Sequence, residues 1–416
     1  MSNDNTTAIW NVCSPSRWPA APERMSFSTL LELESCPRRW ALKWAEYSGL
    51  WEGRGYPLLP VQSSLEGTVV HRAIGRINAA ISAKGCTSVR DASAVTALRE
   101  LGGYTVVIKE CIIEGLRSYA TNPRALPVLE TIRQRLTARL PELRSLVQMH
   151  VSRLTLGDQA PNTTRLRKSR SPMGRRPLVD GTYTELEVRD AAIGWQGFID
   201  FLSLSATVCE IRDFKTGSPK PADNLQISAY AVLWSADAEL NPTRRCANRL
   251  ILSYSQHETE IPAPNDEAMA VLREELRQRT ATALESIAQE LPDARPGVDN
   301  CAFCPVRHLC DEYWNWLPNS SAVLETPQPY FSDVEVTLTG RHGPLSWDGC
   351  MYDPIASRHT NILMRTANLQ FELRTGQRLR LLNVHINVPQ QVDDQKESHI
   401  CVVKMGTTSE AFLCSP

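Results

Sequence analysis

The sequence has no long apolar run, and its first residues do not have the pattern expected of a secretory leader. No stretch of its 416 residues reaches the roughly 18 to 20 uncharged apolar residues that a helix needs to span a bilayer. The first residues, MSNDNTTAIWNVC, lack the basic segment followed by an apolar one that marks a leader. These absences predict a cytoplasmic protein with no membrane partner.

Neither sign of charge dominates, and one nucleotide-binding motif is missing. The 45 Lys and Arg residues and the 46 Asp and Glu residues give a formal net charge of -1. The whole protein is therefore not a polycation, and any nucleic-acid surface must be a local patch. The sequence also lacks G-x-x-x-x-G-K-[ST], the phosphate-binding loop of nucleotide-driven enzymes such as helicases. Any unwinding of a duplex would need a partner protein.

Composition and hydrophobic periodicity divide the chain into four segments. Residues 1–24 form an irregular lead-in, residues 25–317 form the main domain, and residues 318–329 form a linker rich in Pro, Ser and Asn. Residues 330–416 read as five short strands and predict a small β-barrel; the strands are VEVTLTG, NILMRTA, QRLRLLNVHINV, HICVVKM and EAFLC. With 42% apolar residues, a chain of this length can bury two or three compact units.

The main domain is predicted to be an α/β fold. SSLEGTVVHRAIGRINAAI has apolar residues at helical spacing and predicts an amphipathic helix. An insert at about 86–180 begins as helices and ends in a basic loop, RLRKSRSPMGRRP. Three strands follow (TYTELEVRD, GWQGFIDFLSL and TVCEIRDFKTG), then a helix, a further strand and a long helix.

The second and third of these strands form a hairpin that carries unusual charges. On a strand, Asp213 and Lys215 project from the same face, roughly 6.5 to 7 Å apart, and Asp200 is expected diagonally across from Asp213. Two converging carboxylates repel unless a divalent cation lies between them, and Mg²⁺ prefers oxygen ligands. The lysine could stabilise negative charge that develops on a phosphate. The alternative is an ordinary surface ion pair worth under about 1 kcal/mol.

These residues belong to an ordered set that resembles a known enzyme family. The set resembles the RecB-like branch of the PD-(D/E)XK nuclease superfamily, which includes the CRISPR-associated RecB-like exonucleases. In that family a G-x-x-x-H helix, a glutamate-bearing strand, G-x-x-D, D-x-K and Q-x-x-x-Y follow one another. The matching positions here are, in the same order, Gly67 to His71, Glu187, Gly197 to Asp200, Asp213 to Lys215, and Gln226 to Tyr230.

The resemblance implies a restriction-endonuclease-like core and a role for each matched residue. A Mg²⁺ or Mn²⁺ ion would be held by His71, Asp200, Asp213 and the backbone carbonyl of Phe214. Lys215 would activate water and stabilise the phosphorus under attack. Gln226 and Tyr230 would position the lysine or the DNA backbone. Glu187 would give acidic support, and Glu185 or Glu66 could take its place.

Four of the twelve cysteines form a further candidate metal site. CAFCPVRHLC contains Cys301, Cys304 and Cys310, and Cys36 in ESCPRRW is the candidate fourth ligand. On spacing alone, a structural zinc ion and an iron–sulfur cluster are equally compatible. The nuclease relatives carry the same layout and bind a 4Fe-4S cluster, so the resemblance implies that cluster, with a role in joining the two ends of the domain. The other cysteines stand alone and are expected to be small buried apolar residues.

The basic loop and the predicted barrel each admit two interpretations. The loop could grip DNA phosphates or be a solvated loop without function; its cations are Arg165, Arg167, Lys168, Arg170, Arg175 and Arg176. In the barrel, TGQRLRLLNVHI predicts a strand with a basic face and a core face. This pattern resembles an OB fold that holds single-stranded DNA. Because aromatic residues are few in this segment, the pattern is equally compatible with a domain that docks on another protein.

The function predicted from the sequence is metal-dependent hydrolysis of DNA. Exonuclease action on single-stranded DNA or DNA ends is favoured, in repair or in defence against foreign DNA, beside a helicase or another protein of such a system. The alternative is a non-catalytic DNA-binding scaffold subunit of a larger complex, although a scaffold has no need of the full set of charged residues. An RNA-directed nuclease also stays open, since the sequence does not reveal 2′-hydroxyl discrimination.

Overall fold

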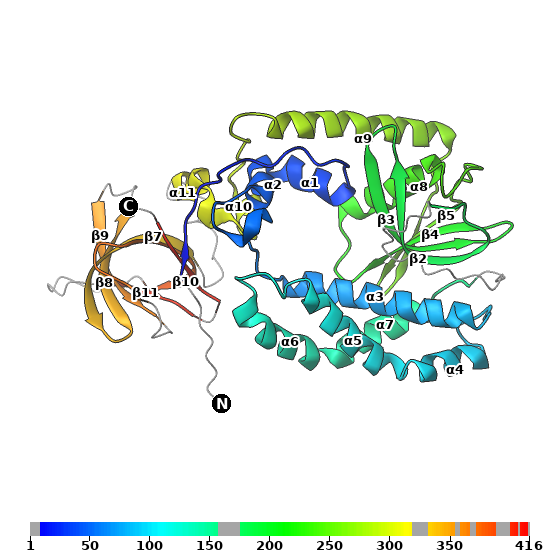
Figure 1. The fold of residues 1–416 in the computed structure, drawn as a ribbon, viewed down its shortest axis with the longest axis horizontal. Helices are drawn as coiled ribbons and strands as arrows, with labels where there is room; N and C mark the ends of the chain where they lie inside the picture. The colour runs from blue at the N-terminus through cyan, green and yellow to red at the C-terminus, as the bar shows by residue number, and fades with distance from the viewer. Residues whose placement is uncertain are drawn as a thin grey trace, which may run out of the picture.

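A computed structural model describes residues 9–156, 175–317, 332–353, 358–366, 372–387, 400–406 and 408–414. The chain forms a mixed α/β domain and a β-barrel that lies beside it (Figure 1). The predicted linker, residues 318–329, lies outside the described residues. Within the described ranges, the helices are all too short or too polar to cross a membrane.

The α/β domain is built on a five-stranded sheet in the order β2-β3-β4-β5-β6. Neighbouring strands are antiparallel except β4 and β5, which are parallel and joined by helix α8 (Pro221–Ala236). A parallel pair requires such a crossover, and the helix returns the chain across one face of the sheet. The strands are β2 (Gly181–Asp190), β3 (Trp195–Leu204), β4 (Cys209–Lys215), β5 (Arg249–Tyr254) and β6 (Glu258–Ile261).

Helices cover both faces of this sheet and bury two separate cores. One core lies between the sheet and helices α1 (Phe27–Ser35), α2 (Pro37–Trp44), α8 and α9 (Asp266–Ile287). The other lies between the opposite face of the sheet and a layer made of helices. That layer contains α3 (Gln62–Ala83), α4 (Ala92–Glu100), α5 (Gly103–Arg117), α6 (Leu129–Ala138) and α7 (Leu140–Ser152).

Helix α3 is the predicted amphipathic helix, and it runs along the sheet above the other helices of its layer in Figure 1. Its repeating apolar residues are buried because they face α5, α7 and the sheet. Glycine lets it approach closely: a Cβ on Gly75 would lie 3.3 Å from the Thr184 hydroxyl of β2. The helices α4 to α7 occupy the stretch in which the sequence predicts a helical insert.

The C-terminal strands close into a five-stranded barrel. The order is β7-β8-β9-β11-β10, and β10 pairs back with β7. All neighbours are antiparallel except β9 and β11. The barrel strands are β7 (Ser332–Gly343), β8 (Ser346–Asp353), β9 (Arg358–Arg365), β10 (Arg378–Asn387) and β11 (Cys401–Lys404).

Two further strands lie outside the closed ring. Strand β12 (Glu410–Leu413) pairs with β10, and β1 (Trp10–Asn11) pairs in parallel with β12. From β1 the chain leads back toward α1, so the described part of the predicted lead-in links the barrel to the α/β domain (Figure 1). The sequence predicts EAFLC as a fifth barrel strand, whereas the fifth strand of the ring is β8.

The barrel is docked on the segment that carries three of the four candidate cluster cysteines. Between Cys301 and Trp316 this segment forms the short helices α10 (Val298–Cys301), η3 (Arg307–Leu309) and α11 (Asp311–Trp316). Arg380 of β10 donates to the His308 carbonyl at 2.8 Å and to Asp311 at 2.7 Å. The His308 ring stacks on Phe412 of β12, with centroids 3.7 Å apart.

This contact shows what one residue of the predicted basic face does. The alternation around Arg380 is compatible with DNA binding and with protein docking, and Arg380 itself is only 5% exposed and is paired with Asp311 of the α/β domain. A buried arginine needs such partners to compensate for its lost hydration. This face of β10 is therefore a contact between the two domains.

Candidate active site

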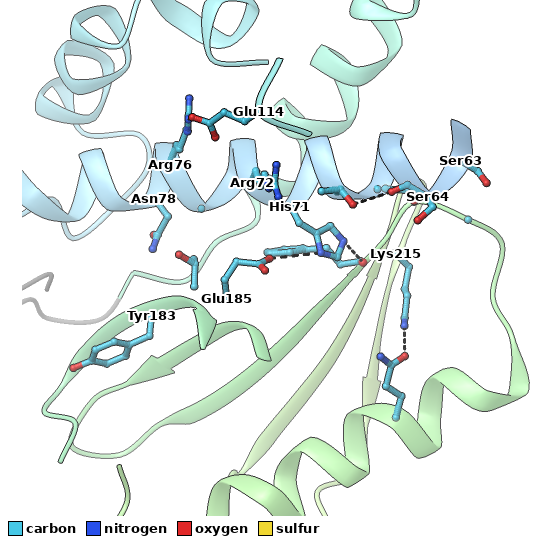
Figure 2. A pocket seen from close by; sticks show the side chains of 18 of the residues that line it. Ser63, Ser64, His71, Arg72, Arg76, Asn78, Glu114, Tyr183, Glu185 and Lys215 are labelled. Atoms are coloured by element: carbon cyan, nitrogen blue, oxygen red, sulfur yellow. Dashed lines mark hydrogen bonds and ion pairs between the residues drawn. The ribbon is translucent and has the colours of Figure 1, made fainter. Parts of the chain in front are cut away.

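His71 projects from α3 toward the sheet, where Glu185 reaches toward it, whereas Lys215 extends away from them toward α8 (Figure 2). Its Nδ1 lies 3.2 Å from Asp200 Oδ1 and 3.8 Å from Glu185 Oε1. Its Nε2 lies 2.9 Å from the Phe214 carbonyl oxygen. One ligand atom from each of His71, Glu185 and Asp200 can be chosen so that all three lie within 4.8 Å of one another. One nitrogen and two carboxylate oxygens suit a hard divalent cation.

Asp200 occupies a break in the backbone pairing of β3. The β2–β3 ladder stops at Thr184↔Phe201 and resumes at Leu186↔Ile199. On its other side, Asp200 Oδ2 accepts a hydrogen bond from the Phe214 N–H at 2.7 Å. The β3–β4 register, extended by one residue, sets Asp200 opposite Asp213 and not diagonally across from it. The turn at residues 205–208 fixes this register, so the two aspartates are direct neighbours on adjacent strands.

Glu185 lies across from Asp200 and has an unusual backbone conformation. Its φ is 52°, in the left-handed region that non-glycine residues rarely adopt within a strand. Such strain persists where the surrounding structure holds it, commonly at functional sites. Here it accompanies a carboxylate that reaches the same cluster as His71 and Asp200.

The other two acidic candidates lie apart from this cluster. Glu187 accepts a hydrogen bond from Arg189 at 2.8 Å, and Glu66 accepts one from Gln62 at 2.9 Å. Glu66 also lies 3.2 Å from the Arg139 guanidinium. Of the three glutamates weighed from the sequence, Glu185 is the one that the fold brings to His71.

Replacement of Glu185 by Gln is expected to weaken the binding of Mn²⁺ at least tenfold, because a neutral amide replaces an anionic ligand. The matched change Glu187→Gln should leave the affinity unchanged, since it removes only a half-exposed ion pair worth about 0–1 kcal/mol. Calorimetric titration of both variants with Mn²⁺ measures the difference. Equal Mn²⁺ affinities of the two variants would show that Glu185 does not bind the metal.

Lys215 is held on the helix side of the same site. Its Nζ lies 2.6 Å from Asp213 Oδ2 and donates to Gln226 Oε1 at 2.7 Å, a contact drawn in Figure 2. The Gln226 amide donates in turn to the Tyr230 hydroxyl at 2.8 Å. Gly197 of β3 makes room for Tyr230, because a Cβ there would lie 2.9 Å from the tyrosine ring. The fold thus assembles the D-x-K and Q-x-x-x-Y residues into one chain of contacts.

The protonation states show a site with surplus negative charge. Burial alone would lower the pKa of His71, but Asp200, with Glu185 and Asp213, raises it to about 9. Burial and the neighbouring Asp200 raise the pKa of Asp213 to about 7. Burial acts to raise the pKa of Asp200 as well, but His71 and the Phe214 N–H outweigh it and lower that pKa. In the metal-free protein, an imidazolium at His71 and a proton that Asp213 binds up to about pH 7 therefore offset part of the negative charge that a bound cation would neutralise.

A cavity of about 1600 Å³ opens over these residues. Helices α3 and α5 line one side, and β2, the end of β4 and the start of α8 line the other. Arg72 and Lys220 add positive charge to its lining, and Ser63, Ser64 and Thr68 add hydroxyl groups. The cavity offers donors for phosphate oxygens beside the candidate metal ligands.

The basic loop is described only at its end. Arg165, Arg167, Lys168 and Arg170 lie outside the described residues. Arg175 contacts Asp237 at 2.8 Å and Glu239 at 3.0 Å, and Arg176 is exposed. Neither of these two arginines lines the cavity described above.

The four candidate cluster cysteines are all buried in one region, with exposed fractions of 6–9%. Cys36 lies at the junction of α1 and α2, and backbone contacts hold this junction to the cysteine-rich segment: the Arg38 N–H donates to the Asp293 carbonyl at 2.8 Å. Burial, and less strongly the neighbouring thiols Cys301 and Cys36, raise the pKa of Cys304 to about 12. The donor set fits a soft metal centre, because thiolates are its preferred ligands.

Comparison with known proteins identifies the family. No curated protein matches the chain. Residues 24–311 match the model of the PD-(D/E)XK nuclease superfamily, a segment that contains every residue of the site described above. The chain belongs to the PD-(D/E)XK nuclease superfamily.

Proposed function

We propose that the chain is an exonuclease of the RecB-like branch that hydrolyses single-stranded DNA or DNA ends with Mg²⁺ or Mn²⁺. Membership of the superfamily implies a metal-dependent nuclease with DNA as its substrate. The observation that carries the finer proposal is a pair of contact sets that meet at β4. His71 contacts Asp200, and Asp213 contacts Lys215, which donates to Gln226. The Phe214 N–H, next to Asp213 along β4, donates to Asp200 and joins the two sets. Those are the residues that the resemblance to the RecB-like branch matches.

The donor atoms of the site divide between metal binding and charge stabilisation. His71, Glu185, Asp200 and Asp213 would hold the divalent cation, which when bound supplies Lewis-acid polarisation of a phosphoryl oxygen. The Phe214 carbonyl contacts His71 Nε2, an outer contact of the kind that orients a ligating imidazole through its second nitrogen. It therefore supports His71 and need not bind metal itself.

Lys215 acts as a cation in this scheme. Burial alone would lower the pKa of its ammonium group, but Asp213, Asp223 and Asp200 raise it. A protonated lysine cannot take a proton from water, so its part is to stabilise the negative charge that develops on the phosphate. Gln226 and Tyr230 fix its orientation.

The barrel and the cysteines support the remaining parts of the proposal. Five strands in the order β7-β8-β9-β11-β10, closed and with β9 parallel to β11, support an OB-like barrel. The burial of Cys36, Cys301, Cys304 and Cys310 in one region, together with the resemblance of their layout to that of the nuclease relatives, supports the 4Fe-4S cluster over zinc.

An end-labelled DNA assay tests the proposal. Anaerobically purified protein with Mg²⁺ or Mn²⁺ is expected to shorten single-stranded DNA stepwise from one end, and the labelled end gives the polarity. Addition of EDTA should stop the reaction. Cleavage of a closed circular strand, which has no ends, would show that the protein is an endonuclease and not an exonuclease. Tight DNA binding without cleavage under either metal would favour the scaffold subunit.

A further inference from the structure

The Lys215 ammonium has a third partner that the family motif does not contain. An ammonium group carries three N–H donors. One of them donates to Gln226, while Asp213 Oδ2 lies 2.6 Å and Asp223 Oδ1 3.3 Å from the same nitrogen. The three oxygen atoms come from β4 and from two positions of α8, so one hydrogen bond and two ion pairs hold the ammonium group.

Asp223 is itself held from two sides. It is 7% exposed, and its Oδ2 accepts hydrogen bonds from the Lys220 N–H at 2.8 Å and from the Tyr254 hydroxyl at 2.9 Å. One carboxylate oxygen therefore faces the lysine, while the other is fixed by the protein.

Tyr254 is a firm support for this carboxylate. It ends β5 and pairs with Lys215 in the parallel β4–β5 ladder. Its carbonyl accepts a hydrogen bond from Arg153 at 2.8 Å, and its ring stacks on His257. The tyrosine, which is 4% exposed, thus connects the strand beside Lys215 to the first turn of α8.

A purely structural role for Asp223 explains only half of this arrangement. Asp223 closes a capping box at the start of α8, and a carboxylate there is favoured by the helix dipole. Capping uses Oδ2 alone and needs no tyrosine. The approach of Oδ1 to Lys215, and the placement of Asp223, Gln226 and Tyr230 on one face of α8, remain to be explained.

We propose that Asp223 and Tyr254 are positioning residues that hold the Lys215 ammonium against the reacting phosphate. This inference rests on the nuclease activity proposed above. Gln226, supported by Tyr230, contacts the ammonium from the second turn of α8, and Asp223, supported by Tyr254, contacts it from the first turn.

Asp223→Asn is expected to lower kcat about tenfold with little change in the KM for DNA, because misplacement of a charge-stabilising group costs rate more than binding. Tyr254→Phe should lower kcat about threefold, since Asp223 keeps its contact with the Lys220 N–H. Double replacement should cost little more than Asp223→Asn alone, because the tyrosine acts through the aspartate. Steady-state kinetics on end-labelled DNA gives these values.

A helix-cap variant separates positioning from folding. Asn265 caps α9 by accepting from the Ala268 N–H at 2.8 Å, far along the chain from the site residues. Asn265→Ala should lose comparable stability to Asp223→Asn yet keep the wild-type kcat. If both variants lost activity in proportion to stability, Asp223 would be structural only.

Chemical labelling tests the contact without any need for cleavage. Acetylation of Lys215, followed by mass spectrometry, is compared with that of the exposed Lys220 in the same protein. Asp223→Asn should speed labelling of Lys215 several-fold relative to Lys220, while Asn265→Ala should not. An unchanged ratio would overturn the positioning role. An inactive wild type with the expected labelling would instead overturn the proposed nuclease activity and leave the contact established.

Discussion

Replacement of Lys215 or of Asp213 by alanine is expected to lower DNA cleavage about 10²- to 10³-fold. Lys215→Ala removes the cation that faces the phosphate, and loss of a single preorganised charge-stabilising group costs about 10² to 10³ in rate. Asp213→Ala removes a metal ligand and the closest partner of the same lysine, at 2.6 Å. Single-turnover cleavage of end-labelled DNA with saturating Mn²⁺ measures both losses. A wild-type rate in either variant would remove this mechanism.

Folding is not expected to account for the loss in Asp213→Ala. Burial and Asp200 raise the pKa of Asp213 to about 7, so the folded protein binds this proton more tightly than the unfolded chain does. Above pH 7 the ionised carboxylate therefore destabilises the metal-free fold. At pH 8 the metal-free variant should unfold at the same temperature as the wild type or a higher one.

A buried aspartate outside the site provides the matched control. Asp190 of β2 is 2% exposed and accepts two hydrogen bonds from the Arg273 guanidinium of α9, at 2.5 and 2.9 Å. Asp190→Asn should lower stability, because it weakens a partly buried ion pair, and should keep full cleavage. Loss of cleavage in this variant would show that activity follows stability and not the charges of the site.

The site residues that the sequence predicts well are those whose spacing follows a regular element. Asp213 and Lys215 are two apart on a strand, and Gln226 and Tyr230 are four apart on a helix, so the period of each element places each pair on one face. The structure joins them through Lys215 and Gln226. Such pairs depend on backbone geometry that the local sequence largely determines.

The residues that the sequence did not resolve depend on irregular backbone or on distant partners. Glu185 and Glu187 are two residues apart, so the period of a strand predicts both side chains on the same face. The features that distinguish them are the positive φ of Glu185 and the break in the ladder at Asp200. Asp223 and Tyr254 meet through the β4–α8–β5 crossover, which no local pattern reveals. Tertiary context decides both cases.

The barrel shows the same limit for whole strands. Strand β8, SWDGCMYD, has few β-branched residues and contains Gly349, so its composition does not indicate a strand. Its backbone pairs with β7 and β9 on either side, and Gly349 is required there because a Cβ would lie 2.8 Å from the Thr337 carbonyl oxygen. This segment forms a strand because it closes the barrel, although its intrinsic strand propensity is weak.

Replacement of Cys304 by alanine is expected to abolish the brown colour of anaerobically purified protein and to lower its solubility. Cys304 is 6% exposed and lies in the segment that faces the α1–α2 junction at Cys36. A centre that joins these two segments closes a very long loop, and its loss frees the unfolded chain and loosens both ends of the domain. Visible absorbance and iron content per chain measure the change.

The same replacement is expected to loosen the barrel, because the cysteine segment is also the barrel's docking surface. Arg307 and Tyr313 of that segment both contact Asp333 of β7, Tyr313 at 2.7 Å, and Arg380 of β10 contacts the His308 carbonyl. Limited proteolysis should therefore separate the barrel from the α/β domain in Cys304→Ala sooner than in the wild type. Cys111→Ala, which removes a fully buried thiol from the helical layer, should keep both the iron and the protease resistance. A colourless wild type that contains zinc after anaerobic purification would show that the cysteines bind zinc and not an iron–sulfur cluster. The coupling of the cysteine segment to the barrel would still hold, because it depends on the contacts of Arg307, Tyr313 and Arg380 and not on which metal the thiolates bind.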